Sequence, residues 1–277
     1  MESVIKNLKP YLILALIGFS TLNCFCVYNY KLKQTETRTY SSDAVNQIEV
    51  ATRNGSIAVA KTTDTVIAAL IKKYCQGRDK ADAESAIKNI IIKDTIIGNE
   101  LEIEAEMPTG SRSYGASFEI SAPESTELDL NSTNGSITIS DIKEKIKVNT
   151  TNGKISLSNT SGIANLNTTN GSVNIESHRG SIKANSSNGS FECTLIEFGT
   201  SDSINLETTN GSIQIYLPDN ISATVDASTT NGSITITGFS SVTYQEQTQT
   251  RVRCRIGNGA SIINIETTNG NITIRTR

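Results

Sequence analysis

The sequence has no tryptophan and few other aromatic residues. Its 277 residues include 8 tyrosines and 6 phenylalanines, so aromatic side chains make up 5% of the chain. Surfaces that stack sugars or nucleic-acid bases usually present exposed aromatic rings, so this composition disfavours both kinds of site. The net charge is −3 and no block of basic residues occurs, so we expect no nucleic-acid partner.

Histidine and metal-binding motifs are equally scarce. His178 is the single histidine, and we expect it to lie in a solvated turn with Arg179 and Gly180. A general base needs a nucleophile and an orienting acid nearby, and serine is too common in this chain to mark a nucleophile. No zinc spacing, phosphate-binding loop or dinucleotide fingerprint occurs. We therefore predict no catalytic residue, no metal and no cofactor.

The first 28 residues have the pattern of a secretory signal or an anchor. Lys6 and Lys9 precede an apolar run from Tyr11 to Phe19, and polar residues follow. Cys24 ends a stretch that loosely matches a bacterial lipobox, which would make it a lipidation site. The alternative is a helical anchor over residues 11–28, near the lower length limit for crossing a bilayer. The segment therefore predicts a location in the bacterial cell envelope, with the protein either anchored to a membrane or exported.

Residues 29–46 are polar, and we interpret them as a tether between this N-terminal segment and the domain that follows. Residues 47–277 are predicted to form that domain. Within it, residues 79–92 break the strand pattern and favour a short helix, with Asp79 or Asp82 as its N-cap. We expect this helix to cover the end of the domain.

The dominant feature of the domain is a repeat around the dipeptide Asn-Gly. Most copies follow a pair of Thr or Ser residues and precede Ser and an aliphatic residue, as in Thr168-Thr169-Asn170-Gly171. The glycines Gly135, Gly153, Gly171 and Gly189 follow one another at intervals of 18 residues, and later intervals are 22 and 21. A weaker turn lies halfway, at Gly162 and Gly180. Each unit therefore contains two strands and two turns.

Apolar residues alternate with polar ones in each strand, as at Ile137 and Ile139 or Ile213 and Ile215, so one face of every strand is buried. Asn-Gly is also a hairpin signal, which leaves an antiparallel meander as the rival fold. The dipeptide recurs at one phase of the unit, and neighbouring units are nearly identical. When these units stack, equivalent residues lie on one another, which favours an all-β β-solenoid of about 18–22 residues per coil. Glycine would supply a positive φ at each corner, and roughly nine coils would form a rod about 40 Å long.

Cysteine and arginine residues of the domain gave two further predictions. Cys193 and Cys254 alternate with polar neighbours, so we interpret both as small core residues, about three coils and about 14 Å apart, too far for a disulfide. Arg251, Arg253 and Arg255 lie on one face of an alternating strand. They form either a solvated face or a site for an anionic ligand such as an acidic glycan or a lipid headgroup.

These features resemble the bacterial DUF4097 family of adhesin-like domains. The resemblance rests on Asn54-Gly55-Ser56-Ile57, the helical insertion, the strand Leu101–Ala105 and the later Thr-Thr-Asn-Gly-Ser-Ile units. It implies a right-handed β-solenoid and an adhesive role, and it supplies no catalytic residues.

On this basis the sequence predicts a non-enzymatic envelope protein that presents a repetitive polar surface to a surface glycan or an envelope protein. The alternative is an envelope signalling or scaffold protein without an adhesive role. A polysaccharide-acting β-helix enzyme is the least favoured function, because the acidic residues of this chain are scattered singly. Two carboxylates can still meet across coils.

Overall fold

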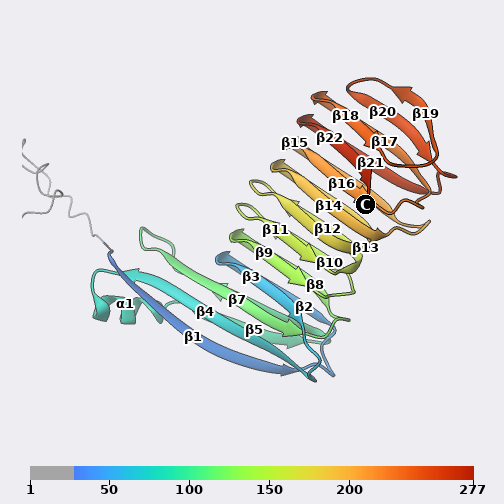
Figure 1. Ribbon diagram of the computed structural model, residues 1–277. Helices are drawn as coiled ribbons and strands as arrows, with labels where there is room; N and C mark the ends of the chain where they lie inside the picture. Colours follow the sequence, from blue (N-terminus) through green and yellow to red (C-terminus); the bar gives the residue numbers. More distant parts are fainter. Residues whose placement is uncertain (1–27) are drawn as a thin grey trace, which may run out of the picture.

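Strands alternate between two walls along the chain, and the computed structural model, which describes residues 28–277, is a β-solenoid (Figure 1). Predictions for residues 1–27, including lipidation of Cys24, lie outside the described residues. Each coil contributes one strand to wall A and one to wall B, and a corner and a half-turn join them. The predicted all-β solenoid is confirmed.

Wall A carries the strand that precedes each Asn-Gly corner. Its central strands are parallel, and antiparallel strands close it at both ends. In spatial order it consists of β5 (Ile91–Ile97), β6 (Glu100–Glu106), β2 (Gln47–Asn54), β8 (Glu127–Asn134), β10 (Ile146–Thr150), β12 (Ser161–Thr168), the second half of β13 (Val173–Asn188), β15 (Ser203–Asn210), β21 (Ser261–Asn269), β17 (Ala223–Asn231), β20 (Arg251–Ile256) and β19 (Val242–Gln247).

Wall B carries the strand that follows each corner. Two antiparallel strand pairs, β1 with β4 and β4 with β7, extend it at the N-terminal end. In spatial order it consists of β1 (Tyr30–Ser41), β4 (Val66–Gly77), β7 (Tyr114–Ala122), β3 (Ile57–Lys61), β9 (Ile137–Ser140), β11 (Ile155–Ser158), the first half of β13, β14 (Phe191–Glu197), β16 (Ile213–Leu217), β22 (Ile272–Thr276) and β18 (Ile234–Thr237).

The core lies between the walls, where aliphatic residues of successive coils stack on one another. In wall B, Ile137 is opposite Ile155, which is opposite Val173. All three are at most 1% exposed. Because side chains of a strand alternate between its two faces, the same register leaves Thr, Asn and Ser on the outside. The coil length predicted from the Asn-Gly spacing is confirmed by this register.

The order of coils in the stack differs from their order in the chain. The coil β2–β3 lies between β6–β7 and β8–β9. The C-terminal coil β21–β22 lies between β15–β16 and β17–β18. Each inserted coil pairs with a neighbour on both sides, so the first and last repeats of the chain are interior coils. Near-identical repeats allow this because any coil presents the same edge to the next.

The prediction of a tether over residues 29–46 is wrong for most of that segment. Residues 30–41 form β1, which pairs antiparallel with β4 along its whole length. Its inner face carries Leu32 and Tyr40, which pack partly buried against the core. Polar residues outnumber apolar ones in β1, so the composition of this segment did not indicate a strand.

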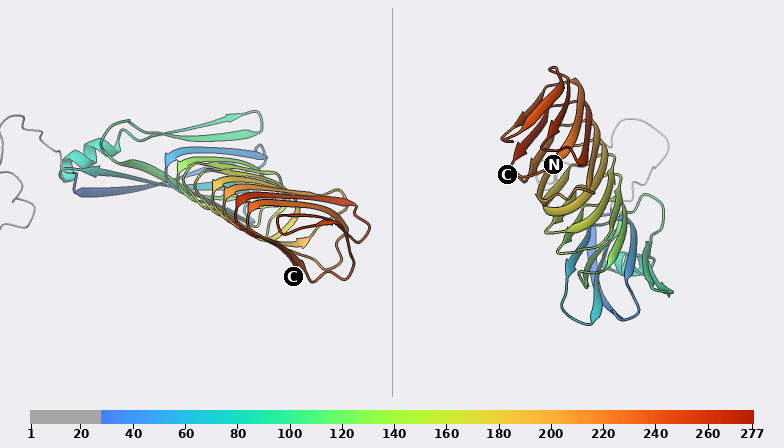
Figure 2. Two further views of the ribbon diagram at one scale, coloured as in Figure 1. Left: turned by 90° about the horizontal axis from the view of Figure 1, so that it is seen from above. Right: turned by 90° about the vertical axis from the view of Figure 1, so that its right-hand side faces the viewer.

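The predicted helix is confirmed as α1 (Lys80–Ile87), with Asp79 as its N-cap; the Asp79 carboxylate accepts a hydrogen bond of 2.8 Å from the backbone N–H of Asp82. The last residues of the predicted range instead begin β5. The helix packs on β4 and β1 at the outer tip of the N-terminal sheet, as both views in Figure 2 and the contacts agree.

The edge strands of the two walls are joined at the N-terminal end by side chains. Arg38 of β1 donates to the carbonyl oxygen of Ile92 at 3.2 Å and binds Asp94 of β5. The hydroxyl of Tyr40 donates to the same carboxylate at 3.1 Å. These contacts close the stack between the exposed edges of walls A and B.

Candidate functional site

The candidate site is built on the Asn-Gly corners. In each unit the first Thr or Ser of the pair is buried, and its hydroxyl donates to the glycine carbonyl of the neighbouring coil. Thr150 donates to Gly135 at 3.1 Å, and Thr168 donates to Gly153 at 3.2 Å. The same bond recurs at the other Asn-Gly corners of the stack, except that Thr52 donates to the carbonyl oxygen of Ala116 at 3.0 Å. These hydroxyls satisfy carbonyl groups that a corner would otherwise leave unpaired.

The asparagine of each corner forms a second ladder on the outside of the stack. The amide of Asn152 donates to the side-chain oxygen of Asn134 at 2.7 Å, and Asn170 donates to Asn152 at 2.8 Å. The ladder is continuous from coil β2–β3 to coil β17–β18. In spatial order it comprises Asn54, Asn134, Asn152, Asn170, Asn188, Asn210, Asn269 and Asn231.

The corner glycines are required by close packing of the backbone. A Cβ on Gly153 would lie 2.0 Å from the carbonyl oxygen of Gly135, and one on Gly171 would lie 1.9 Å from that of Gly153. These glycines have no positive φ, so the predicted reason for glycine at the corners was wrong. Positive φ occurs instead at the half-turns, at Gly162 (φ 92°) and Gly180 (φ 115°). Asn258-Gly259 is a turn between β20 and β21, outside the corner ladder.

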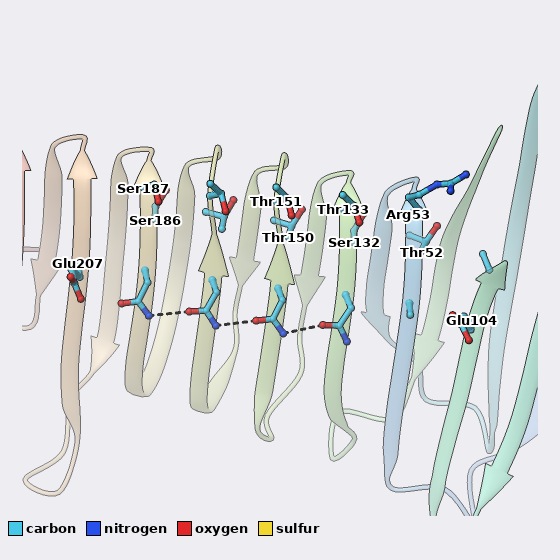
Figure 3. A pocket seen from close by; sticks show the side chains of 18 of the residues that line it. Thr52, Arg53, Glu104, Ser132, Thr133, Thr150, Thr151, Ser186, Ser187 and Glu207 are labelled. Carbon is cyan, nitrogen blue, oxygen red and sulfur yellow. Dashed lines mark hydrogen bonds between the residues drawn. The ribbon is translucent and has the colours of Figure 1, made fainter. Parts of the chain in front are cut away.

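A shallow groove of about 800 Å³ runs along the outer face of wall A, across successive coils (Figure 3). One row of its lining consists of asparagines in mid-strand. Asn149 donates to Asn131 at 2.9 Å, Asn167 donates to Asn149 at 3.0 Å, and Asn185 donates to Asn167 at 2.9 Å. Figure 3 shows these bonds as a line parallel to the stack. We call the four side chains the groove ladder.

The second row of the groove lies two residues further along each strand, so it projects from the same face. It consists of exposed hydroxyl residues, which are Thr133, Thr151, Thr169 and Ser187. Across these four coils the two rows carry no charge. Charged side chains lie at the ends, with Arg53 and Glu104 at one end and Glu207 at the other. The predicted repetitive polar surface is therefore a groove with two regular rows of hydrogen-bonding groups.

The strand positions that precede the groove ladder carry charges that are paired in part. The Lys147 ammonium donates to Asp129 at 2.7 Å, and this bond raises the pKa of Lys147. Asp129 also accepts a hydrogen bond of 3.0 Å from Asn131, the first member of the groove ladder. Beyond Asn185, a second hollow of about 450 Å³ continues the groove toward Asp226 and Arg251.

The arginine face predicted to bind an anionic ligand has its positive charge largely neutralised by carboxylates. Arg251 contacts Asp226 through two hydrogen bonds of 2.9 Å, and Arg253 contacts the same carboxylate at 3.1 Å. Glu246 lies 3.5 Å from Arg251 and 3.9 Å from Arg253. Arg255 is exposed and has no ion pair among the described residues. The three arginines do share one face, and Arg251 and Arg253 already have carboxylate partners, which leaves Arg255 as the arginine of this face that has none among the described residues.

His178 is a core residue, and its prediction as a solvated turn residue is wrong. Its side chain is fully buried, and Nδ1 lies 2.9 Å from Thr160 Oγ1 of the neighbouring coil. Nε2 is buried and has no hydrogen-bond partner among residues 28–277. Burial lowers the pKa of His178 to about 4. The missed signal was the 18-residue step: Ile142, Thr160 and His178 occupy equivalent positions of successive half-turns.

The three described cysteines are buried and free, which agrees with the prediction of Cys193 and Cys254 as core residues. Burial raises the pKa of the Cys193 thiol to about 12, so the reactive thiolate is disfavoured there. Cys193 lies in wall B and Cys254 in wall A. The two cysteines therefore do not lie in one column of stacked coils, although the estimate of about 14 Å from the coil count assumed that they do.

Residues 28–277 lack two further features. No group of three or more His, Cys, Asp or Glu side chains in this range could hold a metal ion. Within the same range, no helix is both long and apolar enough to cross a membrane.

Residues 29–275 match the sequence model of a family described as Toastrack DUF4097. Among curated proteins, no sequence match was found. A candidate adhesin from Bacteroides fragilis is 16% identical, with 88% of this chain and 97% of that chain covered and a TM-score of 0.42. A candidate cell adhesion protein from Clostridium sporogenes is 13% identical, with 89% and 100% covered and a TM-score of 0.38. A candidate lipid binding protein from Parabacteroides distasonis is 11% identical, with 88% and 96% covered and a TM-score of 0.33.

Proposed function

Because the chain belongs to the Toastrack DUF4097 family, we propose that it is a non-enzymatic, adhesin-like protein of the cell envelope that binds an extended polar ligand along the groove of wall A. The observation that carries this proposal is the pair of uncharged rows that repeat over four adjacent coils. A single neutral hydrogen bond contributes about 1 kcal/mol net. Binding therefore depends on many weak contacts made at once.

The chemistry of His178 and Cys193 supports a binding role over an enzymatic one. The single histidine is buried with a pKa of about 4, so it is a weak base and does not reach a substrate. Cys193 is buried as an ordinary thiol. Neither residue meets the requirement that a general base or nucleophile lies within reach of the reacting atoms.

The envelope location rests on the N-terminal sequence, and it is part of the proposal. Residues 1–28 would act as a signal or anchor, with lipidation of Cys24 and an uncleaved helix as the two alternatives. The intact mass of the mature protein separates them, because lipidation requires cleavage before Cys24 and adds acyl chains. A mass equal to that of the uncleaved chain favours the helical anchor.

The main experiment measures retention of the full chain on purified envelope material. Replacing Asn149 and Asn167 with alanine removes the middle of the groove ladder, and we expect retention to fall at least tenfold. The matched control replaces Thr138 and Ser156 with alanine. These two residues are opposite one another on wall B, so the control variant should retain binding. Both variants are checked for unchanged unfolding midpoints.

The alternative function is an envelope scaffold without an adhesive role. It predicts that retention depends on a specific envelope protein and is unaffected by the groove variant. Equal retention of the two double variants would contradict the proposal that the groove is the binding site.

A further inference from the structure

We infer that the ligand of the groove is an uncharged, extended polysaccharide that lies parallel to the stack, with about one sugar over each coil. This inference rests on the proposed function and adds the chemical class and the orientation of the ligand. Three properties of the groove carry it: its charge, its pre-organisation and its spacing.

The charge of the groove selects against ionic polymers. The two rows from Asn131 to Asn185 present only amides and hydroxyls, and Arg53, Glu104 and Glu207 lie outside them. The charged side chains of the ladder coils on this face stand two residues before the ladder, and they are Asp129, Lys147 and Lys183. A charged group that leaves water needs a partner of opposite sign, and the two rows offer none. The lysine nearest the middle of the ladder, Lys147, is already bonded to Asp129. A neutral polymer avoids this cost of desolvation.

The groove ladder is pre-organised to bind hydroxyl groups. An amide has two N–H donors and an oxygen with two lone pairs. In the middle of the ladder, Asn149 and Asn167 each use one donor and one lone pair on their neighbours. One donor and one acceptor remain at each coil, on a side chain whose rotamer is already fixed. A ligand that bonds to them therefore loses less conformational entropy.

The spacing of the rows separates a polysaccharide from a peptide. Neighbouring coils are about 4.8 Å apart, whereas an extended peptide advances about 3.3 Å per residue and alternates its side chains. A peptide along the stack would therefore fall out of register within a few coils. A β-linked sugar in an extended chain advances by close to one coil interval, so its hydroxyls can meet the same amide and hydroxyl in each coil.

The lining of the groove contains no aromatic side chain among its described residues. Sugar recognition here must therefore rest on hydrogen bonds, which are individually weak. The structure accordingly predicts that affinity rises with the length of the polysaccharide until all four ladder coils are covered, and that it then levels off.

The test treats the envelope material before the full chain is added. Periodate cleaves the vicinal diols of sugars, and protease removes peptides. We expect periodate to reduce groove-dependent retention at least tenfold, and protease to leave it unchanged. Salt at about 1 M, which screens ionic contacts, should also leave it unchanged. Groove dependence is defined by the difference between the wild type and a Thr151→Lys, Thr169→Lys variant, whose exposed positions tolerate the change.

The outcomes separate this inference from the function beneath it. If untreated envelope material shows no groove-dependent retention, the proposed function itself fails. If retention depends on the groove but is lost after protease treatment, or is lost in salt, the ligand is a peptide or an ionic polymer. Either result overturns the inference and leaves the binding function intact. The variant Asn149→Ala, Asn167→Ala provides a second, independent disruption of the groove.

Discussion

The corners and the half-turns close the same coils, and they use different physical means. At a corner, the buried hydroxyl, the asparagine and the glycine occupy equivalent positions in successive coils. The asparagine and the glycine each contact their counterpart in the next coil, and the hydroxyl donates to the glycine carbonyl of that coil. At a half-turn, Ile142, Thr160 and His178 share one position. The residues before them, Asp141, Asn159 and Ser177, all have positive φ values between 50° and 60°. At the corner, the close approach between neighbouring backbones leaves room only for glycine. At the half-turn, the positive φ can be adopted by several residue types.

The largest effect should come from a corner glycine. In the Gly153→Ala variant, Cβ would lie 2.0 Å from a backbone oxygen that the adjacent coil holds in place. We expect the free energy of unfolding to fall by at least about 4 kcal/mol. Gly162→Ala at the half-turn should cost about 2 kcal/mol, from an alanine at positive φ. Equilibrium urea unfolding compares the two, and equal losses would remove the distinction between corner and half-turn.

The next effect is a dependence of stability on pH that originates at the half-turn. The folded-state pKa of His178 is lowered to about 4, and the unfolded-state pKa is about 6.5. As the pH falls below 6.5, the unfolded chain gains a proton that the folded chain does not accept, so stability falls until the pH reaches about 4. Between pH 7 and pH 5 the loss should be about 2 kcal/mol.

His178 is the only histidine, so the variant His178→Leu is a clean control for this pH effect. Its free energy of unfolding should change little between pH 7 and pH 5, whatever its value at pH 7. Chemical denaturation at both pH values measures the two slopes. An equal slope in wild type and variant would show that His178 does not titrate in this range.

The smallest effects compare two side chains of one corner. Thr150→Val keeps the shape of the buried side chain but leaves the Gly135 carbonyl without its donor, so we expect a loss of about 1.5 kcal/mol. Asn152→Ala removes an exposed ladder amide whose partners can bond to water, and the expected loss is about 0.5 kcal/mol. The ratio of the two losses, read from urea unfolding, tests whether the inner ladder contributes more than the outer one.

Much of the stack could be predicted because its information is local. The period of two placed Ile137 and Ile155 in the core, and the 18-residue step placed them opposite one another. The outward Asn and Thr rows followed from the same alternation. The groove could not be predicted in this way, because the period of the sequence indicates which face a side chain occupies but not whether that face is hollow. His178 was misplaced although its 18-residue step from Thr160 was readable.

The order of coils at the two ends could not be predicted, for a physical reason. Asn269 and Asn231 present the same amide and the same backbone edge, so the repeat gives no preference for which of them follows Asn210. The antiparallel strands β19 and β20 decide the matter by covering the far side of β17. The β1 strand was missed because its pairing partner, β4, lies beyond an intervening coil in the sequence.

The position of the C-terminal coil has a consequence for how the protein is completed. Residues 261–276 fill a gap between two coils that precede them in the sequence. Until they are synthesised and fold into place, β15–β16 and β17–β18 each expose a bare edge that fits any copy of the repeat. Loss of this coil therefore opens the middle of the rod, and it leaves two unpaired edges that can pair with a neighbouring chain.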